Sequence, residues 1–238
     1  MLYEIAHIIK NRFLFLWKVV EWGNATLFYL MHKKKLMGIN SVLEQVSNAY
    51  RFRTTTEEDV EKLVVFFARQ PEEAFEFFKP HGFDGKAIRE VVKKKSFLTF
   101  VVLKDDVIVG YFFLRCFVNG KCFRGKIVHK DWQGRGIAKL MGMAMAKVSQ
   151  HLDLRMSGSI SPENYASMAF AKASNDIKVH KILENGYYYI EFFPKKVDNQ
   201  PNMGGGNLSL TFHELKSYLS SDTIVEPVAT MLQLKLVA

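Results

Sequence analysis

Apolar residues in the first thirty positions recur every three or four residues, which is the period of an α-helix. The stripe consists of Leu2, Ile5, Ile9, Phe13, Leu16, Val20, Leu27 and Met31. Gly23-Asn24 interrupts the stripe, so the pattern predicts two helices rather than one. Ser41, with Glu44 three residues later, matches a capping box and predicts a further short helix.

From residue 50 to residue 130 the pattern changes between helical and strand-like stretches. Thr55 or Thr56 is placed to cap the first helix of this region. The predicted helical stretches are residues 57–70, a piece between Pro71 and Pro80, and residues 85–95. The predicted strands are residues 50–54, 96–106, 107–120 and 121–130. The last three strands follow one another directly, and an Asp-Asp turn joins the first two of them, which predicts an antiparallel arrangement.

The second half of the chain alternates between helices and strands. Predicted helices cover residues 136–150 and 162–174, the second with Pro162 in its first turn. Predicted strands cover residues 154–161, 187–196 and 207–215. The last two strands form a pair, joined by an Asn/Pro/Gly loop over residues 198–206.

Composition narrows the class of protein and of partner. Of the 238 residues 48% are hydrophobic, with 20 Phe, which supports a packed core, and the formal charge of +9 indicates an anionic partner. That partner is a phosphorylated ligand, nucleic acid or a membrane surface. We disfavour nucleic acid because the lysines are spread out and no known nucleic-acid motif occurs. Cys116 and Cys122 are interpreted as reduced thiols of a cytoplasmic protein, although a hairpin disulfide is geometrically allowed.

The basic residues of the N-terminal stretch lie among aromatic side chains. Lys10, Arg12, Lys18 and the run Lys33-Lys34-Lys35 surround Phe13, Phe15, Trp17 and Trp22. Residues 1–40 are therefore predicted either to lie on the inner face of a membrane as a peripheral contact, or to pack as a helical layer on the core or in a homodimer. Lys18 and Glu21 argue against a membrane-spanning segment. No short apolar run with a small-residue cleavage site follows the start, so no cleavable signal is predicted.

A glycine-rich turn lies directly after the predicted strand 121–130. It reads KDWQGRGIAKL over residues 130–140, and an alanine-rich helical pattern follows at once. Backbone N–H groups at such a helix start favour a bound anion, and small residues let it approach. Arg135 and Lys139 add positive charge. The turn is neither a P-loop nor a dinucleotide fingerprint, because the Gly-Lys-Ser/Thr ending and the third glycine are missing.

The turn, taken with the order of elements around it, resembles the GNAT superfamily of acyl-coenzyme A-dependent N-acyltransferases. The family motif Gln/Arg-x-x-Gly-x-Gly/Ala appears as Gln133, Gly136 and Ala138, preceded by Ile127-Val128 at the strand end. The resemblance implies an α/β (α+β) fold with a mixed, mostly antiparallel central sheet flanked by helices. It also implies that the pyrophosphate of acetyl-CoA binds the turn, whose remaining residues are Gly134, Arg135, Ile137 and Lys139. The predicted division is a helical extension (1–49), the GNAT-like domain (50–215) and a C-terminal tail (216–238).

A second family feature follows the next strand, where an Asn contacts the pantetheine arm of the cofactor. Asn164 occupies that place, and Ser167 stands where a small residue is usual. Seven residues after the Asn the family commonly carries a Tyr that protonates the leaving thiolate, but here the position is Ala171. Tyr165, or one of the three tyrosines at 187–189, is the substitute on this interpretation.

The base that accepts the amine proton is less clear from the sequence. The strand before the turn contains no Asp or Glu, which leaves His129, and Glu191 on a later strand, as candidates. No metal is predicted, because neither His nor Cys shows ligand spacing. Without a nucleophile elbow, direct attack in a ternary complex is favoured over an acyl-enzyme.

The acceptor class stays open at this point. Amino sugars, nucleotide-linked sugars, peptide amines and polyamines all carry a primary amine. The positive charge of the chain favours an anionic small molecule over a polyamine. The alternative function is a non-catalytic coenzyme A-binding or membrane-associated regulatory protein of the same fold, which Ala171 and the carboxylate-free strand support.

Overall fold

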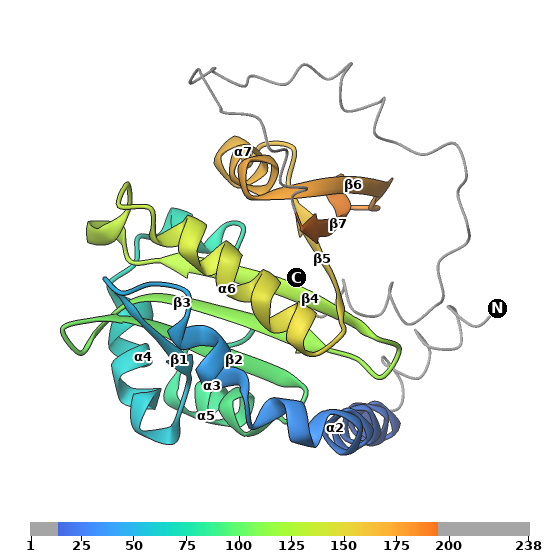
Figure 1. Cartoon of the computed structure of the whole chain (residues 1–238). Coiled ribbons are helices and arrows are strands. Elements are labelled where there is room, and N and C mark those ends of the chain that lie inside the picture. The colour runs from blue at the N-terminus through green and yellow to red at the C-terminus, as the bar shows by residue number, and fades with distance from the viewer. Residues whose placement is uncertain (1–13, 195–238) are drawn as a thin grey trace.

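Seven strands form a single sheet in the order β1-β2-β3-β4-β5-β7-β6 (Figure 1). This arrangement comes from a computed structural model, which describes residues 14–194 and the side chains of residues 18–193. The strands are β1 Arg51–Thr54, β2 Phe97–Lys104, β3 Val107–Cys116, β4 Lys121–Val128, β5 Arg155–Ile160, β6 Asn175–Ile182 and β7 Tyr188–Pro194. All neighbours are antiparallel except β4 and β5, which are parallel. The predicted mixed, mostly antiparallel sheet is confirmed.

Helices cover both faces of this sheet. The α-helices are α2 Leu14–Leu36, α3 Ile39–Glu44, α4 Val60–Ala68, α5 Gly85–Lys93, α6 Ile137–His151 and α7 Tyr165–Ser174. Short 3-10 helices are η1 Glu57–Asp59, η2 Glu72–Phe75 and η3 Lys130–Trp132. Buried side chains of α2, α3, α6 and α7 share one core cluster, and those of α4 and α5 share the other. The sheet therefore separates two apolar layers.

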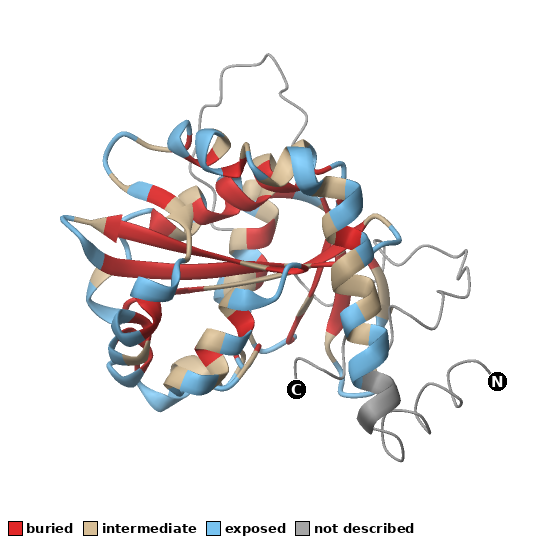
Figure 2. Ribbon diagram, turned by 90° about the horizontal axis from the view of Figure 1, so that it is seen from below, coloured by how far each residue is buried: buried red, intermediate tan, exposed pale blue. Residues whose placement is uncertain are grey.

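The central strands explain why the sheet is so apolar. β2 and β3 read FLTFVVLK and VIVGYFFLRC, and most of their residues are buried on both faces (Figure 2). Phe100 and Phe112 stack at 4.7 Å on the α6 face, whereas Tyr111 and Phe113 lie on the α4 face. A strand covered on both sides reads as a continuous apolar run rather than an alternating one.

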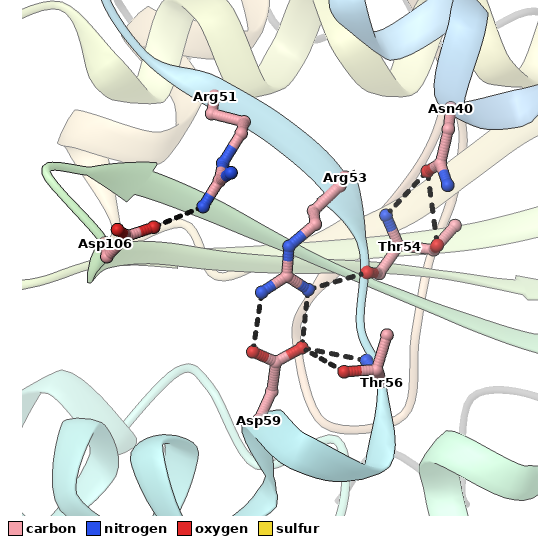
Figure 3. A network of polar contacts seen from close by, with 7 residues as sticks. All are labelled: Asn40, Arg51, Arg53, Thr54, Thr56, Asp59 and Asp106. Atoms are coloured by element: carbon pink, nitrogen blue, oxygen red, sulfur yellow. Dashed lines mark hydrogen bonds and ion pairs between the residues drawn. The ribbon is translucent and has the colours of Figure 1, made fainter.

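Polar contacts fix the edge strand β1 to the first helices (Figure 3). Arg53 donates to both carboxylate oxygens of Asp59, at 2.5 and 2.7 Å, and Asp59 also accepts from the backbone N–H of Thr56 at 2.8 Å. Thr56 and Asp59 form a capping box at the start of η1, so the predicted cap at Thr56 is confirmed. Asn40 in α3 accepts from the Thr54 backbone at 3.0 Å, which connects α3 to the same strand.

Helix α2 is continuous through Gly23-Asn24, so the predicted break there is wrong. The reason is tertiary. The Asn24 side chain donates to the Cys116 carbonyl at 3.1 Å and accepts from the Val118 N–H at 3.1 Å. These two bonds occupy the end of β3 and outweigh the low helix propensity of glycine, which is about 1 kcal/mol relative to alanine.

Other boundaries also differ from those predicted. Ser41 does not cap a helix, because α3 begins at Ile39 after Gly38. Between Pro71 and Pro80 only the short η2 forms, and Pro162 precedes α7 instead of lying in its first turn, because Asn164 is the N-cap. A strand, β6, was missed: it follows α7 directly and pairs with β7. The predicted partner of β7, residues 207–215, lies outside the described residues, as does the predicted tail from 216.

The residues before β1 take part in the core. Phe28, Ile39, Leu43 and Val46 are buried in the same cluster as the strands and α6. Within the described part of the chain this segment therefore packs on the sheet and not apart from it. Over residues 14–194, no helix is both long and apolar enough to cross a bilayer. Cys116 and Cys122 are free, face each other across β3 and β4, and have thiol pKa values raised by burial.

Candidate functional site: the glycine turn and the gap between β4 and β5

The glycine turn reverses the chain between β4 and α6. Gly134 and Gly136 have φ of +74° and +76°, in the left-handed region that favours glycine, and Gly136 is the N-cap of α6. No atom lies within 4 Å of the position a Cβ would take at either residue. Ile137 is buried in the core and anchors the start of the helix. The turn is therefore anchored in the core through Ile137, and the space beside Gly134 and Gly136 is open.

Five successive backbone N–H groups of this turn, those of residues 134–138, find no acceptor among the described residues. The next two donors in sequence, at Lys139 and Leu140, both bond to the Gly136 carbonyl. Unsatisfied N–H groups at a helix start, with the positive end of the helix dipole, form a site for an anion. The donor set fits a pyrophosphate.

The charged side chains of the turn are exposed. The Arg135 guanidinium lies 4.5 Å from the centre of the Trp132 ring and donates to the Asp131 carbonyl at 3.3 Å. Gln133 and Lys139 are exposed beside it. Arg135 and Lys139 therefore surround the turn with positive charge without an ion-pair partner among the described residues.

Next to the turn, β4 and β5 separate. They pair only over Lys121–Phe123 and Arg155–Ser157, and the rest of β4 has no neighbour on that side. In Figure 1 the strands β5 to β7 and α7 rise away from β4. A cavity of about 570 Å³ occupies the gap, lined from β4 by residues 123–127 and from β5 and the residue after it by residues 158–161. Consecutive strand residues face opposite sides of a sheet, so the lining reaches both faces.

Three of the residues predicted from the sequence line this cavity: Ile127, Asn164 and Ser167. Asn164 caps α7 by accepting from the Ser167 N–H at 2.9 Å, which leaves its amide N–H₂ without a protein partner in the described structure. Lys126 connects the cavity to the turn, because its Nζ donates to the Ala138 carbonyl at 3.0 Å. The structure thus places Asn164 in the cavity, whereas the turn residues 133–139 lie outside its lining.

Val128 lies at the end of β4 with its backbone toward the gap. The neighbouring His129 N–H donates to the Val109 carbonyl of β3 at 2.9 Å. Successive N–H groups of a strand point to opposite sides, so the Val128 N–H points away from β3 and toward the gap.

The candidate proton-transfer residues lie elsewhere. His129 is 8% exposed, accepts from the Asp131 N–H at 3.3 Å and packs against Phe66 at 5.7 Å. Glu191 pairs with His180 at 2.8 Å across β6 and β7. Tyr165 is 79% exposed at the start of α7. None of the three lines the cavity.

The cavity contains further titratable residues, of which only Tyr187 was considered from the sequence. Glu73, Glu76 and Lys79, from η2 and the segment after it, lie at its mouth and are exposed. Arg124 and Lys126 line it from β4. Tyr187, one of three tyrosines considered as a proton donor, also lines it. The sequence signal for Arg124 and Lys126 was the Arg-Gly-Lys alternation within the predicted strand, which places the two basic side chains on one face. Over the described residues, no cluster of three His, Cys, Asp or Glu is placed to hold a metal ion.

Comparison with solved structures identifies the fold. The GNAT domain of Streptomyces lividans PAT superimposes with a TM-score of 0.53 at 16% identity, covering 60% of this chain and 89% of that domain. RimJ of Mycobacterium smegmatis, solved with CoA-disulfide, gives 0.50 at 19% identity, covering 63% and 84%. The aminoglycoside acetyltransferase AAC(6')-Ib, solved with ribostamycin and coenzyme A, gives 0.50 at 12% identity, covering 62% and 94%.

By sequence, no protein-family profile and no curated protein matches the chain. The structural likeness therefore rests on the path of the backbone. The expected GNAT fold is confirmed by these superpositions together with the sheet order described above.

Proposed function

We propose that this protein transfers an acyl group, acetyl in the simplest case, from its coenzyme A thioester to the primary amine of a small molecule. The observation that carries the proposal is the row of five N–H groups at residues 134–138 that have no acceptor in the described part of the chain, beside a cavity that opens between β4 and β5. The GNAT fold supports it, because among the solved neighbours the aminoglycoside acetyltransferase AAC(6')-Ib has coenzyme A bound and RimJ has CoA-disulfide bound.

Several residues would hold the acyl donor. The N–H groups of the turn, with Arg135 and Lys139, would bind its pyrophosphate. The free amide of Asn164, beside Ser167, would donate to the uncharged pantetheine arm. When bound, the thioester supplies an activated acyl carbon. The Val128 N–H, directed into the gap, would polarise the carbonyl of that group.

Acyl transfer to an amine needs a proton acceptor and a proton donor. Glu73 and Glu76 at the cavity mouth are the carboxylates nearest to an incoming acceptor, and we assign the base role to one of them or to water they order. Tyr187 lines the same cavity and would protonate the leaving thiolate. His129 and Glu191 stay weaker candidates, because each faces a different environment.

Two measurements test the proposal. Calorimetric titration with coenzyme A should show binding that Gly136→Asp abolishes. Release of free thiol from acetyl-CoA should rise above the background hydrolysis rate in the presence of a primary amine. The amine panel should include amino sugars, amino acids, peptides and polyamines.

A second function, cofactor binding without catalysis, has one specific observation in its favour. β4 presents Arg124 and Lys126 to the cavity and no carboxylate. Coenzyme A binding with no amine-dependent thiol release across the panel would establish this alternative and exclude the enzyme.

A further inference from the structure

Two cations face the gap from the same side of β4. Arg124 lies with its guanidinium carbon 3.4 Å from the centre of the Phe192 ring on β7. The Lys126 Nζ lies 3.1 Å from the centre of the Phe170 ring on α7. Both residues line the cavity, and so do both rings. Aromatic faces from two other elements thus hold the two charged groups within the gap.

Neither cation has a carboxylate partner among the described residues. Among the described residues, Arg124 donates to the Met156 sulfur, at 4.0 Å, and Lys126 donates to the Ala138 carbonyl. The acidic residues of the cavity, Glu73 and Glu76, are exposed at its mouth and form no ion pair with either cation. Arg124 and Lys126 are half-buried, and removing a charged group from water without a counter-charge is costly.

Desolvation lowers the pKa values of both side chains. Burial lowers the pKa of Lys126 to about 6, with a further contribution from the nearby Arg124. Burial lowers the pKa of Arg124 to about 9, so Arg124 stays charged at neutral pH. Lys126 is then largely neutral at pH 7.5 in the free protein. An anion placed beside it would favour its protonated form.

The acyl donor itself does not supply that anion within the gap. Its phosphates match the N–H groups of the turn, and its pantetheine arm, toward Asn164, is uncharged. We propose that Arg124 and Lys126 form an anion-binding subsite that selects a substrate carrying a carboxylate close to the reacting atoms. This inference rests on the proposed function and narrows its substrate class. The carboxylate belongs either to the acyl group, as in a dicarboxylic acyl thioester, or to the amine acceptor, as in an amino acid.

Paired substrates test the two sources of the carboxylate. One arm compares succinyl-CoA with acetyl-CoA, using one amine. The other compares an amino acid with the amine that its decarboxylation gives, using acetyl-CoA. We expect kcat/KM to favour the carboxylate-bearing member at least tenfold in one arm. Arg124→Gln should reduce that preference about tenfold, with coenzyme A affinity retained. Lys178→Gln is the matched control, because Lys178 is exposed on β6 outside the cavity.

A second readout separates binding from a structural role of the lysine. At pH 7.5 the wild type saturated with coenzyme A is titrated with the preferred carboxylate ligand in two buffers of different ionisation enthalpy. Proton uptake is expected, because Lys126 becomes charged on binding. Lys126→Arg, already charged, should bind the ligand with much less uptake. This measurement needs no turnover and no variant that removes the charge.

Each outcome is decisive. A lack of preference in both arms, in a protein that binds coenzyme A and releases thiol, overturns the subsite and leaves the proposed function intact. A preference that Arg124→Gln leaves unchanged also overturns it. A wild-type protein that does not bind coenzyme A would instead overturn the proposed function.

Discussion

Gly136 begins α6 with a backbone conformation that side chains rarely adopt, and its N–H belongs to the row of free donors. Gly120, in the turn between β3 and β4, has a closely similar φ of +74° and equally open surroundings. The two glycines therefore allow backbone strain to be separated from ligand contact. At this scale the anion site is a property of a few peptide groups.

Gly136→Asp should abolish measurable coenzyme A binding, because it places a carboxylate against the pyrophosphate. Gly120→Asp carries the same backbone strain and should bind coenzyme A normally. Calorimetric titration of both folded variants measures the effect. Equal affinity in the two would contradict the placement of the pyrophosphate.

The second prediction at this scale concerns His129. Its Nδ1 accepts a hydrogen bond from the Asp131 N–H, and its ring packs against Phe66. His129 does not line the cavity. We therefore expect His129→Ala to change kcat less than threefold, whereas Glu73→Gln with Glu76→Gln should lower it by about 10²–10⁴ if one of them is the base. A large loss with His129→Ala alone would return the base role to the histidine.

At the scale of elements, the ion pair of Arg53 and Asp59 joins β1 to the start of α4. Asp59 is 2% exposed and Arg53 27%, whereas the partners of the neighbouring pair, Arg51 and Asp106, are largely exposed (Figure 3). Burial alone would raise the pKa of Asp59. Hydrogen bonds from Arg53 and Thr56 outweigh burial and hold that pKa below its usual value.

Asp59→Asn should lower the free energy of unfolding by about 1–3 kcal/mol, because a mostly buried Arg53 loses its charged partner. Asp106→Asn is the control and should cost about 0–1 kcal/mol, since both members of the Arg51–Asp106 pair are exposed. Urea unfolding at pH 7 measures both variants. Similar costs for the two would show that burial does not set the strength of these pairs.

The same pair predicts a dependence on pH. A carboxyl with a depressed pKa in the folded state stabilises fully above its unfolded pKa of about 4. This contribution is lost as the pH falls through the folded pKa. The stability difference between wild type and Asp59→Asn should therefore be constant near neutrality and shrink below about pH 4. A difference that grows on acidification would contradict the assigned direction.

At the scale of the whole molecule, α2 divides its residues between the core and solvent. Phe28 is fully buried, and Glu21 pairs with Arg115 at 3.0 Å. Trp22, Leu30 and Met31 are exposed by 64–70%, with Lys33 and Lys34 beside them. Exposed apolar side chains next to lysines suit an anionic membrane surface or a second copy of the chain.

We propose that the exposed side of α2, which carries Trp22 and Leu30, docks on an anionic membrane. Trp22→Gln with Leu30→Gln should reduce co-sedimentation with phosphatidylserine vesicles several-fold and leave thermal stability unchanged. Val65→Gln, an exposed valine on α4, is the control and should sediment as the wild type does. If the double variant instead changes the protein from dimer to monomer and the wild type ignores vesicles, the face is a subunit contact.

How much the sequence determined differs with the range of the interactions involved. The glycine turn, the strand before it and the helix after it were predicted from residues 121–150 because local conformation and apolar period specify them. The same holds for a helix cap at Thr55 or Thr56, which the structure places at Thr56, and for the order of the first three long strands. The continuity of α2 through Gly23-Asn24 and the strand β6 were not predicted, because contacts with distant residues decide both. Asn24 bonds to the end of β3, and β6 is defined by its pairing with β7.

The tertiary structure alone decided what the site contains. The sequence places Gln133, Gly136 and Ala138 in one motif and Asn164 in a second family feature. The structure places Asn164 in the cavity, which Lys126 connects to the Ala138 carbonyl. The sequence does not show that β4 and β5 separate after three residue pairs. Nor does it show that Arg124 and Lys126 face the resulting gap with no carboxylate partner in the described part of the chain. It also gave no reason to prefer Glu73 over His129 as the base, or Tyr187 over Tyr165 as the proton donor. Motifs depend on neighbours in the chain, whereas burial, charge pairing and cavity shape depend on residues that only folding brings together.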